Sequence, residues 1–448
     1  MKLCQPYRVA FFLLLFAPAA NAEDWTQFRG PHGDGVVREA NPPARWGEDS
    51  NVIWKVALPG RGWSSPVTAK GRVFVTTAES AKEEKPRRGE SGIVPDALDP
   101  QQHEYRWQVL CLDATTGNVI WNRTAYEGKP RIRKHRSNTY ASETPATDGE
   151  RLIAWFGMTG ISCYDFDGNR LWDKDLGAFP TQAGWGTGSS PVIYADAVFV
   201  QCDNDKSSFL VALDKRTGNE LWRKARDERT NWSTPYLWKN RVRTELVTTG
   251  GKKMRSYDLQ TGELLWEMNA TGRTSATAVG NEELLYVDSV EWFQGSPVRL
   301  VAVRAGGAGD ISLKPGEKES PFVAWSITYG TYHNTSPLVV DDCLYMLEQH
   351  TGIVRCFDAR TGKRHYQERI PEATGSTASP WTAGGKIFCL DEVGRTSVLE
   401  SGPRFKLLAA NRLDENMFWA SAAFTGDRLI LRSMENLYCI GESAGANK

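Results

Sequence analysis

Apolar and polar residues alternate along most of the chain in short runs, and turns rich in glycine, asparagine and aspartate separate these runs. Alternation with a period of two predicts β-strands that are buried on one face. No segment shows a helical period of useful length. The pattern therefore predicts an all-β protein built from many short strands.

An internal repeat organises these strands. A turn motif recurs in which an aspartate is followed by two or three residues, a glycine and then, further on, an aromatic residue. Its copies are LDATTGNVIW (Asp113 to Trp121), YDFDGNRLW (Asp165 to Trp172), LDKRTGNELW (Asp214 to Trp222), YDLQTGELLW (Asp258 to Trp266) and FDARTGKRHY (Asp358 to Tyr366).

A second signal precedes the copies, in which small residues and a proline lead into an apolar run. It occurs at Pro66, Pro145, Pro191, Pro235, Pro337 and Pro380, with degenerate copies starting at Ser275 and Ser421. These eight starts are spaced mostly 42–46 residues apart, with longer gaps in the first and fifth repeats. A repeat of this length with four short strands is typical of a propeller blade.

The last repeat ends after its third strand, and NVIWKVAL near the N-terminus supplies the missing fourth strand, with Trp54 in the aromatic position. Closing the ring in this way removes an open sheet edge. The sequence therefore predicts an eight-bladed β-propeller of four-stranded antiparallel blades. We expect a signal peptide at 1–22, an N-terminal extension at 23–45, the propeller at 46–442 and a C-terminal tail at 443–448.

The repeat resembles the tryptophan-docking repeat of pyrroloquinoline-quinone (PQQ) propellers. That superfamily includes quinoprotein alcohol dehydrogenases and the propeller of the outer-membrane barrel assembly machine. In addition, DWTQFRGPHGDG (Asp24 to Gly35) resembles the opening of exported PQQ-like repeat proteins of planctomycete-type bacteria. The resemblance implies the propeller fold and leaves activity open, because the fold carries both enzymes and scaffolds.

The first 22 residues have the features of a leader. Lys2 and Arg8 precede a short apolar run, and Ala20-Asn21-Ala22 is an A-x-A cleavage site. We therefore expect export to the periplasm or the extracellular space; the alternative is an uncleaved N-terminal anchor. The whole chain has 54 basic and 54 acidic residues, a balance that argues against a nucleic-acid partner.

The chain has 17 tryptophans, and they divide into two groups. Aromatic side chains on the fourth strands have the size and the single N–H group to wedge between blades and bond a backbone carbonyl. We expect this structural docking role for Trp54, Trp121, Trp172, Trp222, Trp266, Trp325 and Tyr366. The third-strand position two residues before the turn aspartate holds Cys, Ala or Ser interchangeably, which indicates a small packing slot and not a metal or redox site.

A second group lies just before the first strand of a blade, where the chain descends into the central funnel. These residues either plug the channel or line a ligand pocket. With their polar neighbours, the candidate binding residues at the funnel mouth are Trp63, Tyr140, Glu143, Trp185, Asn231, Trp232, Arg273, Tyr332, His333 and Trp419.

Long loops and basic residues are expected on the same face as the funnel. The insert at 79–106 and the connection at 122–141 carry a basic rim of Arg87, Arg88, Arg131, Arg133, Lys134 and Arg136. Such runs are often only solvated surface, but long loops clustered on one face of a rigid scaffold commonly carry function.

These features favour an exported, non-catalytic scaffold that binds through its loop-rich face, with no cofactor and no metal. Its partner would be another exported or envelope protein, or an acidic glycan attracted by the basic rim. The alternatives are a PQQ- and calcium-dependent dehydrogenase and a carbohydrate-binding propeller. In the quinoprotein dehydrogenases that the repeat resembles, a disulfide between adjacent cysteines packs on the quinone. This sequence has no adjacent pair of cysteines.

Overall fold

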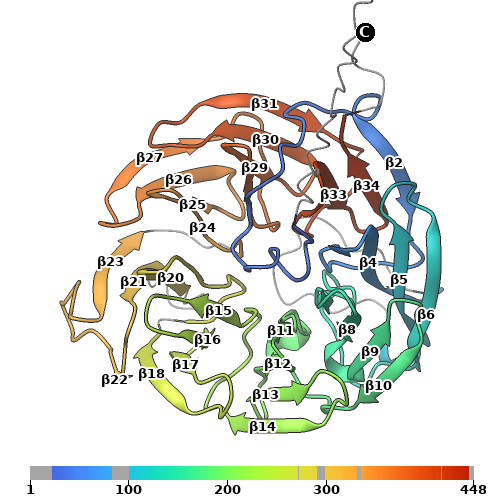
Figure 1. The fold of residues 1–448 in the computed structure, drawn as a ribbon, viewed down its shortest axis with the longest axis horizontal. Helices are drawn as coiled ribbons and strands as arrows, with labels where there is room; N and C mark the ends of the chain where they lie inside the picture. The colour runs from blue at the N-terminus through green and yellow to red at the C-terminus, as the bar shows by residue number, and fades with distance from the viewer. Residues whose placement is uncertain are drawn as a thin grey trace, which may run out of the picture.

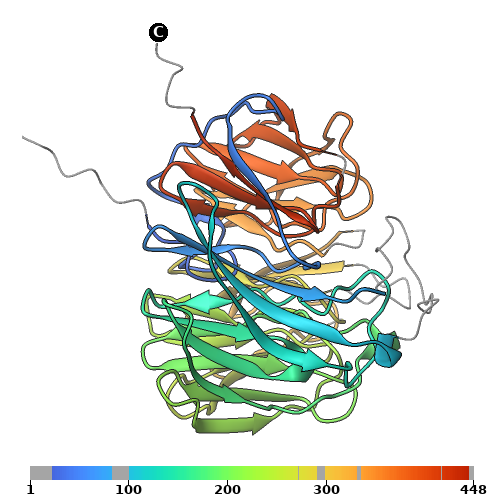
Figure 2. The ribbon, with the colours of Figure 1, turned by 90° about the vertical axis from the view of Figure 1, so that its right-hand side faces the viewer.

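The computed structural model describes residues 23–82, 100–270, 272–289, 298–329, 334–414 and 416–442. Within these residues the strands form eight sheets, arranged as blades around a central channel (Figure 1). Figure 2 shows the ring from the side. The all-β, eight-bladed propeller expected from the repeat is confirmed.

Each blade contains four antiparallel strands that run in order from the channel to the rim. In the first four blades these are β3 (Val67–Ala69), β4 (Arg72–Glu79), β5 (Tyr105–Asp113) and β6 (Val119–Gly128); β7 (Ala146–Thr147), β8 (Arg151–Trp155), β9 (Ile161–Asp165) and β10 (Arg170–Lys174); β11 (Val192–Tyr194), β12 (Ala197–Cys202), β13 (Phe209–Asp214) and β14 (Glu220–Ala225); and β15 (Tyr236–Lys239), β16 (Thr244–Thr248), β17 (Lys253–Tyr257) and β18 (Leu264–Asn269).

The other four blades repeat this order. They are β19 (Val279–Gly280), β20 (Leu284–Ser289), β21 (Val298–Arg304) and β23 (Val323–Tyr329); β24 (Leu338–Val340), β25 (Cys343–Leu347), β26 (Ile353–Asp358) and β27 (Arg364–Arg369); β28 (Trp381–Ala383), β29 (Lys386–Leu390), β30 (Arg395–Glu400) and β31 (Leu407–Arg412); and β32 (Ala423–Thr425), β33 (Arg428–Arg432), β34 (Asn436–Ile440) and β2 (Val52–Ala57). Short 3-10 turns lie at η1 (Pro100–Gln102), η2 (Gly157–Thr159) and η3 (Gln182–Gly184).

The ring closes through the N-terminal strand, as the sequence predicts. β2 pairs antiparallel with β34, and Trp54 lies opposite Cys439. First and last parts of the chain therefore share one sheet, which leaves no blade with an unpaired third strand.

The aspartate of the repeat builds the turn between the third and fourth strands. In the first blade, Asp113 Oδ1 accepts hydrogen bonds from the backbone N–H of Thr115 and from both the N–H and the hydroxyl of Thr116. These bonds hold the pKa of the Asp113 carboxyl below its ordinary value. Gly117 follows with a φ of +76°, which a glycine adopts without strain.

The docking tryptophans join each blade to the next. Five of them donate the indole N–H to a backbone carbonyl beside the turn of the following blade: Trp54 to Ala114, Trp121 to Phe166, Trp172 to Lys215, Trp222 to Leu259 and Trp325 to Ala359, at 2.8–3.2 Å. The turn glycine lies against the same indole ring. A Cβ atom on Gly218, for example, would meet the Trp172 ring at 2.6 Å.

Two predicted docking residues behave differently. Trp266 donates its indole N–H to the Glu245 carboxylate of its own blade, at 2.9 Å. The following blade lacks the usual turn there; a longer connection places β22 (Gly309–Asp310) parallel to β18. Tyr366 packs edge-on against Phe405, because a tyrosine has no indole N–H and the next blade again lacks the aspartate turn.

Cross-strand register explains the small residues on the third strands. Seven of the eight small residues lie directly opposite the docking aromatic of their own blade, as the pairs Cys111–Trp121, Cys163–Trp172, Ala212–Trp222, Ser256–Trp266, Ala302–Trp325, Cys356–Tyr366 and Cys439–Trp54. Only a small side chain leaves room for the ring to lie across the sheet. The seven cysteines in the described residues are all free and buried.

A closed ring of hydrogen bonds surrounds the channel. In every blade, the residue at the hydroxyl position of the proline signal donates its backbone N–H to the side-chain oxygen of the same position in the next blade. The residues are, in order, Ser65, Thr144, Ser190, Thr234, Thr277, Ser336, Ser379 and Ser421, with N···O distances of 2.9–3.2 Å, and Ser421 donates back to Ser65. These bonds satisfy N–H groups that have no neighbouring strand on the channel side. We call them the hydroxyl ring.

The N-terminal segment packs inside the propeller. β1 (Val36–Val37) pairs parallel with β28, the Trp25 side chain is buried, and Arg29 donates to the carbonyl oxygen of Pro337 at 2.6 Å. This segment, drawn in blue, crosses the channel mouth in Figure 1. The sequence places residues 23–45 outside the propeller; in the structure, part of this extension closes one end of its channel.

Candidate functional site

The central channel widens into a cavity of about 360 Å³ at the end opposite the N-terminal segment's entry. Its walls come from two kinds of segment: the connections that lead into a first strand, such as the one with Trp185, and the loops between second and third strands, such as the one with His350. Both kinds of segment lie on one face of a propeller. We call this cavity the funnel.

Four tryptophans from four different connections line the funnel. Trp63 and Trp419 stack with ring centroids 4.7 Å apart, and Trp185 and Trp232 meet at 5.5 Å with a 40° tilt. Trp63 is 8% exposed, whereas the other three are half-buried. The chain therefore brings aromatic surface from distant repeats to one place.

Hydrogen bonds fix the orientation of two of these rings. The indole N–H of Trp63 donates to the carbonyl oxygen of Ser137 at 2.8 Å, and that of Trp232 donates to Gly186 at 2.9 Å. Rings held in this way need no reorganisation when a ligand stacks on them. The Trp419 indole nitrogen is buried and has no protein partner among the described residues.

The connection that carries Trp63 rests on a buried arginine. Arg432 is 0% exposed and donates to the carbonyl oxygens of Ser64 and Thr76, at 2.8 and 2.9 Å. Burial lowers the pKa of Arg432 to about 9. Arg432 is thus a positioning group beneath the funnel wall.

Uncharged polar groups make up most of the remaining lining. Fourteen of the 23 lining residues carry a hydroxyl or a carboxamide: Ser65, Ser137, Asn138, Ser142, Thr144, Thr187, Ser190, Thr234, Ser275, Asn334, Gln349, Thr377, Ser379 and Ser421. Six of them belong to the hydroxyl ring. Glu392 is the one carboxylate in this lining, and it accepts a hydrogen bond from Thr377 at 2.7 Å. No lysine or arginine is among the lining residues that the structure describes.

The floor of the funnel includes Phe28. This residue belongs to the N-terminal segment, which enters the channel from the other end, so the same segment closes one mouth and shapes the site at the other. Nothing in the repeat pattern signals this contribution, because residues 23–35 lie outside the repeats.

The structure assembles part of the site expected from the sequence. Trp63, Trp185, Trp232 and Trp419 line the funnel, as does Asn334. Tyr332 and His333 lie outside the described residues. Ligand binding by any of these side chains stays a prediction.

Four other predicted residues are not part of the described funnel lining. Tyr140 is buried between two blades, with its hydroxyl donating to the carbonyl oxygen of Ile132. Asn231 donates to Ser233 and Thr249 and accepts from the Thr274 N–H. Neither these two nor Arg273 and Glu143 belong to the lining. They differ from the expectation because a connection exposes only some of its side chains to the channel.

Glu143 is 2% exposed and accepts a hydrogen bond from the hydroxyl of Thr187, a funnel residue. Burial raises the pKa of the Glu143 carboxyl from 4.5 to about 7, and the hydrogen bond from Thr187 opposes this rise only in part. Glu143 thus supports the wall through Thr187 and does not face the cavity.

Some side chains of the basic rim form contacts with other residues of the protein. Arg131 forms an ion pair with Asp175 at 2.9 Å. Lys134 is 6% exposed and lies over the Tyr140 ring, 5.4 Å from its centroid. Arg133 is exposed and Arg136 half-buried, while Arg87 and Arg88 lie outside the described residues. The sequence alone does not reveal these internal contacts.

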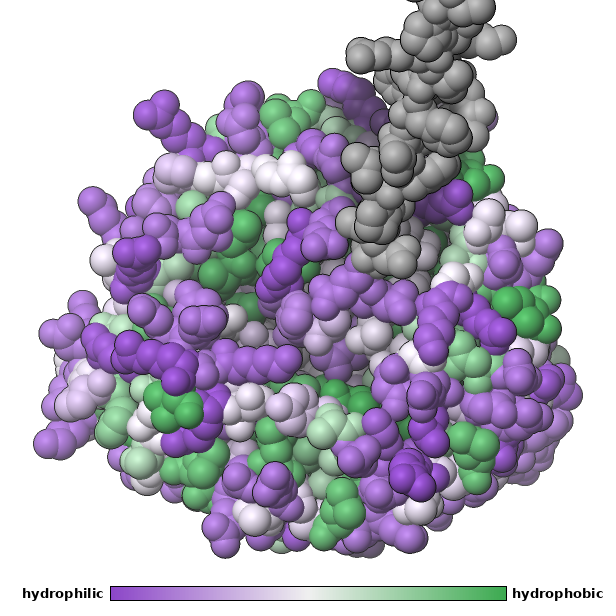
Figure 3. All heavy atoms as spheres, viewed as in Figure 1, coloured by the Kyte–Doolittle hydropathy of each residue, from purple (hydrophilic) through white to green (hydrophobic). Residues whose placement is uncertain are grey.

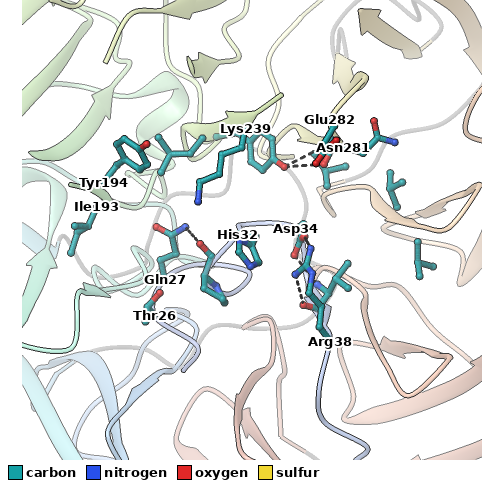
Figure 4. A pocket seen from close by; sticks show the side chains of 18 of the residues that line it. Thr26, Gln27, His32, Asp34, Arg38, Ile193, Tyr194, Lys239, Asn281 and Glu282 are labelled. Atoms are coloured by element: carbon teal, nitrogen blue, oxygen red, sulfur yellow. Dashed lines mark hydrogen bonds and ion pairs between the residues drawn. The ribbon is translucent and has the colours of Figure 1, made fainter. Parts of the chain in front are cut away.

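A second cavity of about 760 Å³ lies at the other mouth, between the N-terminal segment and the turns joining first to second strands. Figure 4 shows Lys239 and Tyr194 across this cavity from Asp34 and Arg38. Arg38 and Asp34 pair with each other at 2.7 Å. The face around it is mainly hydrophilic, with only scattered apolar patches (Figure 3). The aromatic funnel is therefore the stronger candidate.

Comparisons with known proteins identify the family. Residues 102–223 and 157–421 match the model of a family described as outer membrane protein assembly factor BamB. The chain belongs to this family. No curated protein sequence matches the chain.

Solved structures show the same fold at low identity. BamB from Moraxella catarrhalis superposes with a TM-score of 0.59 at 12% identity, covering 89% of this chain and 99% of that chain. A europium-containing methanol dehydrogenase gives 0.58 at 11% identity, with 94% and 98% covered. The quinohemoprotein alcohol dehydrogenase ADHIIG from Pseudomonas putida HK5 gives 0.57 at 11%, with 95% and 81% covered. At this identity the likeness concerns the fold alone, and BamB and dehydrogenases share it.

The funnel lining offers few charged groups to PQQ with calcium. PQQ carries three carboxylates, and burying them calls for cationic partners; the described lining contains His135 and His350 but no lysine or arginine. Calcium takes six to eight oxygen ligands, which include carboxylates and amide carbonyls; the described lining supplies one carboxylate, Glu392, and the described residues contain no cluster of three or more acidic, histidine or cysteine side chains suited to a metal.

Proposed function

We propose that this BamB-family propeller is an exported, non-catalytic binding protein that holds its partner at the funnel. The observation that carries this proposal is the convergence of Trp63, Trp185, Trp232 and Trp419 on one cavity. Concave, mostly preformed sites with aromatic walls and a few placed polar groups are typical of ligand binding.

The chemistry of the lining supports binding without a cofactor. The described lining offers one carboxylate to calcium and no lysine or arginine to a quinone tricarboxylate, and hydrogen bonds already hold the Trp63 and Trp232 rings in their orientations. The partner would be another exported or envelope molecule. A nucleic-acid partner is disfavoured, because the described funnel lining has no lysine or arginine and nucleic acids bind mainly through phosphate contacts.

Two features support export. The first 22 residues have the pattern of a signal peptide. The family model is described as an outer membrane protein assembly factor. Separately, no helix in the described part of the chain has the length and apolar character needed to cross a membrane.

A direct experiment distinguishes the proposed binding function from the alternative function, a PQQ-dependent dehydrogenase. Protein spanning residues 23–448 is titrated with PQQ in the presence of calcium, and its absorbance and dye-linked alcohol oxidation are measured. We expect neither a bound-quinone spectrum nor activity. Saturable binding at micromolar quinone would overturn the non-catalytic proposal.

The funnel itself is tested with the double variant Trp185→Ala/Trp232→Ala. Wild-type and variant protein are immobilised and exposed to an envelope extract of the source cells, and the retained molecules are quantified. We expect the double variant to retain none of the molecules that the wild-type protein retains. The control variant Arg216→Ala, an exposed change in a turn on the opposite face, should retain them as the wild type does. Equal retention by the double variant would show that the binding surface lies elsewhere.

A further inference from the structure

We propose that the funnel recognises a neutral sugar unit, presented at the end of a glycan. This inference rests on the proposed function and names the ligand class of the same site. It follows from the combination, in one cavity, of indole faces, uncharged hydrogen-bonding groups and a described lining without lysine or arginine.

The indole rings supply the apolar half of the match. A pyranose ring has one face of C–H groups, and burying that face against an aromatic ring removes apolar surface from water. Trp185, Trp232 and Trp419 are half-buried and thus retain surface for a ligand. The bond from Trp232 to Gly186 holds that ring in place before any ligand arrives.

The polar lining supplies the other half. Each sugar hydroxyl both donates and accepts hydrogen bonds. Serine and threonine hydroxyls and the side chains of Asn138, Asn334 and Gln349 also do both, unlike lysine, arginine or carboxylate groups. The Oε1 atom of Gln349 is buried and has no protein partner in the described structure, so it offers an unused acceptor at the cavity wall.

The hydroxyl ring adds donors at the funnel floor. Each ring oxygen accepts a backbone N–H from the preceding blade, so its own O–H proton must point to another acceptor. Six ring residues, including Thr144 and Ser190, line the cavity. An acceptor-rich, uncharged ligand satisfies these protons without burying a charge.

The electrostatics select a neutral sugar over an acidic one. Arg131 is already paired with Asp175, and Lys134 is buried over Tyr140. The described lining contains Glu392, His135 and His350 but no lysine or arginine, so it offers a uronic acid or a sulfate no permanently charged cation. The acidic glycan expected from the basic run is therefore not the ligand that the geometry favours.

An extended peptide fits the site less well. Peptides commonly bind by adding a strand to a free sheet edge. On the channel side of the blades, the N–H groups of the hydroxyl ring are already donated within the protein. A ligand in the funnel therefore meets side chains, and these backbone N–H groups are not available to pair with a peptide strand.

The experiment uses protein spanning residues 23–448 and defined probes. Oligosaccharides of two to six units of glucose, mannose, galactose, xylose or N-acetylglucosamine are titrated by calorimetry and by tryptophan fluorescence. We expect at least one neutral series to bind with a Kd below about 1 mM, with a change in fluorescence. Hyaluronan oligosaccharides and a proline-rich peptide serve as the acidic and peptide probes.

Variants locate the binding. Trp232→Ala should weaken the neutral sugar at least tenfold, while Trp232→Phe, which keeps an aromatic ring, should weaken it less. Asn334→Ala should also weaken it, and Arg216→Ala should leave it unchanged. Circular dichroism and thermal melting of each variant separate lost binding from lost folding.

The outcomes distinguish the two proposals. If no neutral sugar binds at about 1 mM, or if Trp232→Ala binds it as tightly as wild type, the sugar assignment is overturned. If the acidic glycan or the peptide binds in a Trp232-dependent way instead, the ligand class is wrong while the funnel remains the binding site. If the envelope partner is retained equally by the Trp185→Ala/Trp232→Ala variant, the proposed function fails independently of any sugar.

Discussion

The backbone N–H of Ser421 donates a hydrogen bond to Oγ of Ser65, 3.0 Å away, although the two residues are 356 positions apart in the chain. This bond joins the last blade to the first and completes the hydroxyl ring. It also lies at the funnel floor, since both residues line the cavity. Closure of the fold and construction of the site thus use the same residues.

The first prediction concerns this closure. Ser65→Ala removes the acceptor of a buried N–H and should lower the free energy of unfolding by about 1–3 kcal/mol. Ser65→Thr keeps the hydroxyl, and threonine already occupies ring positions 144, 234 and 277, so this variant should stay close to wild type. Urea unfolding monitored by fluorescence measures both. Equal stability of the two variants would contradict the role of the ring bond.

The second prediction tests the wedge between docking tryptophan and turn glycine. Gly218 and Gly71 both have a positive φ, +72° and +73°, but a Cβ at Gly218 would meet Trp172 at 2.6 Å whereas a Cβ at Gly71 meets nothing within 4 Å. Gly71→Ala should cost about 1–2 kcal/mol from backbone strain. Gly218→Ala should cost about 1–3 kcal/mol more, because the indole must move. Thermal or urea unfolding of the two variants and the wild type, under the same conditions, measures these losses of stability. Equal losses in the two variants would argue against a tight contact between Gly218 and the Trp172 ring.

The third prediction concerns pH. The folded protein raises the pKa of Glu143 to about 7, so between pH 4.5 and 7 it holds a proton that the unfolded chain releases. Glu143 therefore contributes fully to the free energy of unfolding at low pH. This contribution is lost as the pH rises towards 7, and the loss is roughly 3 kcal/mol at most.

Glu143→Gln stays neutral at every pH and can still accept from Thr187. The difference in unfolding free energy between variant and wild type should therefore grow between pH 5 and pH 8, in favour of the variant. Other titrating groups contribute equally to both proteins and cancel in this difference. A difference that does not change with pH would show that Glu143 titrates normally.

The fourth prediction concerns the thiols. Burial raises the pKa of Cys111, Cys163 and Cys202 to about 12, and the other described cysteines are also buried. Because the thiolate is the reactive form, native protein spanning residues 23–448 should not react with a thiol reagent at pH 8. The same protein in denaturant should expose seven reactive thiols. Rapid labelling of the native protein would contradict the packing role of these residues.

The fold was predictable because its determinants are local. The aspartate turn needs only Asp113, Thr116 and Gly117, which lie within five positions of one another, and the docking tryptophan follows at a constant spacing. The small-residue and proline signal likewise marks six of the eight blades, and degenerate copies without the proline mark the other two. Where the turn is missing, as after Trp266 and Tyr366, the predicted docking contact changed, because it depends on a carbonyl in the following blade.

The site was predictable only in part. The four tryptophans were found because their place before each first strand puts them near the axis. Tyr140 and Asn231 share that place but are buried behind the wall, and Arg273, which is half-buried, is not part of the described lining. The direction of a side chain in an irregular connection depends on local backbone angles. The sequence did not predict that Phe28, Gln349 and Glu392 line the funnel, because no position of the repeat marks them.

The sequence by itself determined the repeat, the number of blades and the strand that closes the ring, since each follows from short-range periodicity. The tertiary structure alone decided which side chains face the channel, how the rings stack, and which charges are neutralised. Residues as distant as Trp63 and Trp419 meet only when the ring closes. The aromatic character of the funnel and its described lining without lysine or arginine depend on those long-range contacts, and no local pattern encodes them.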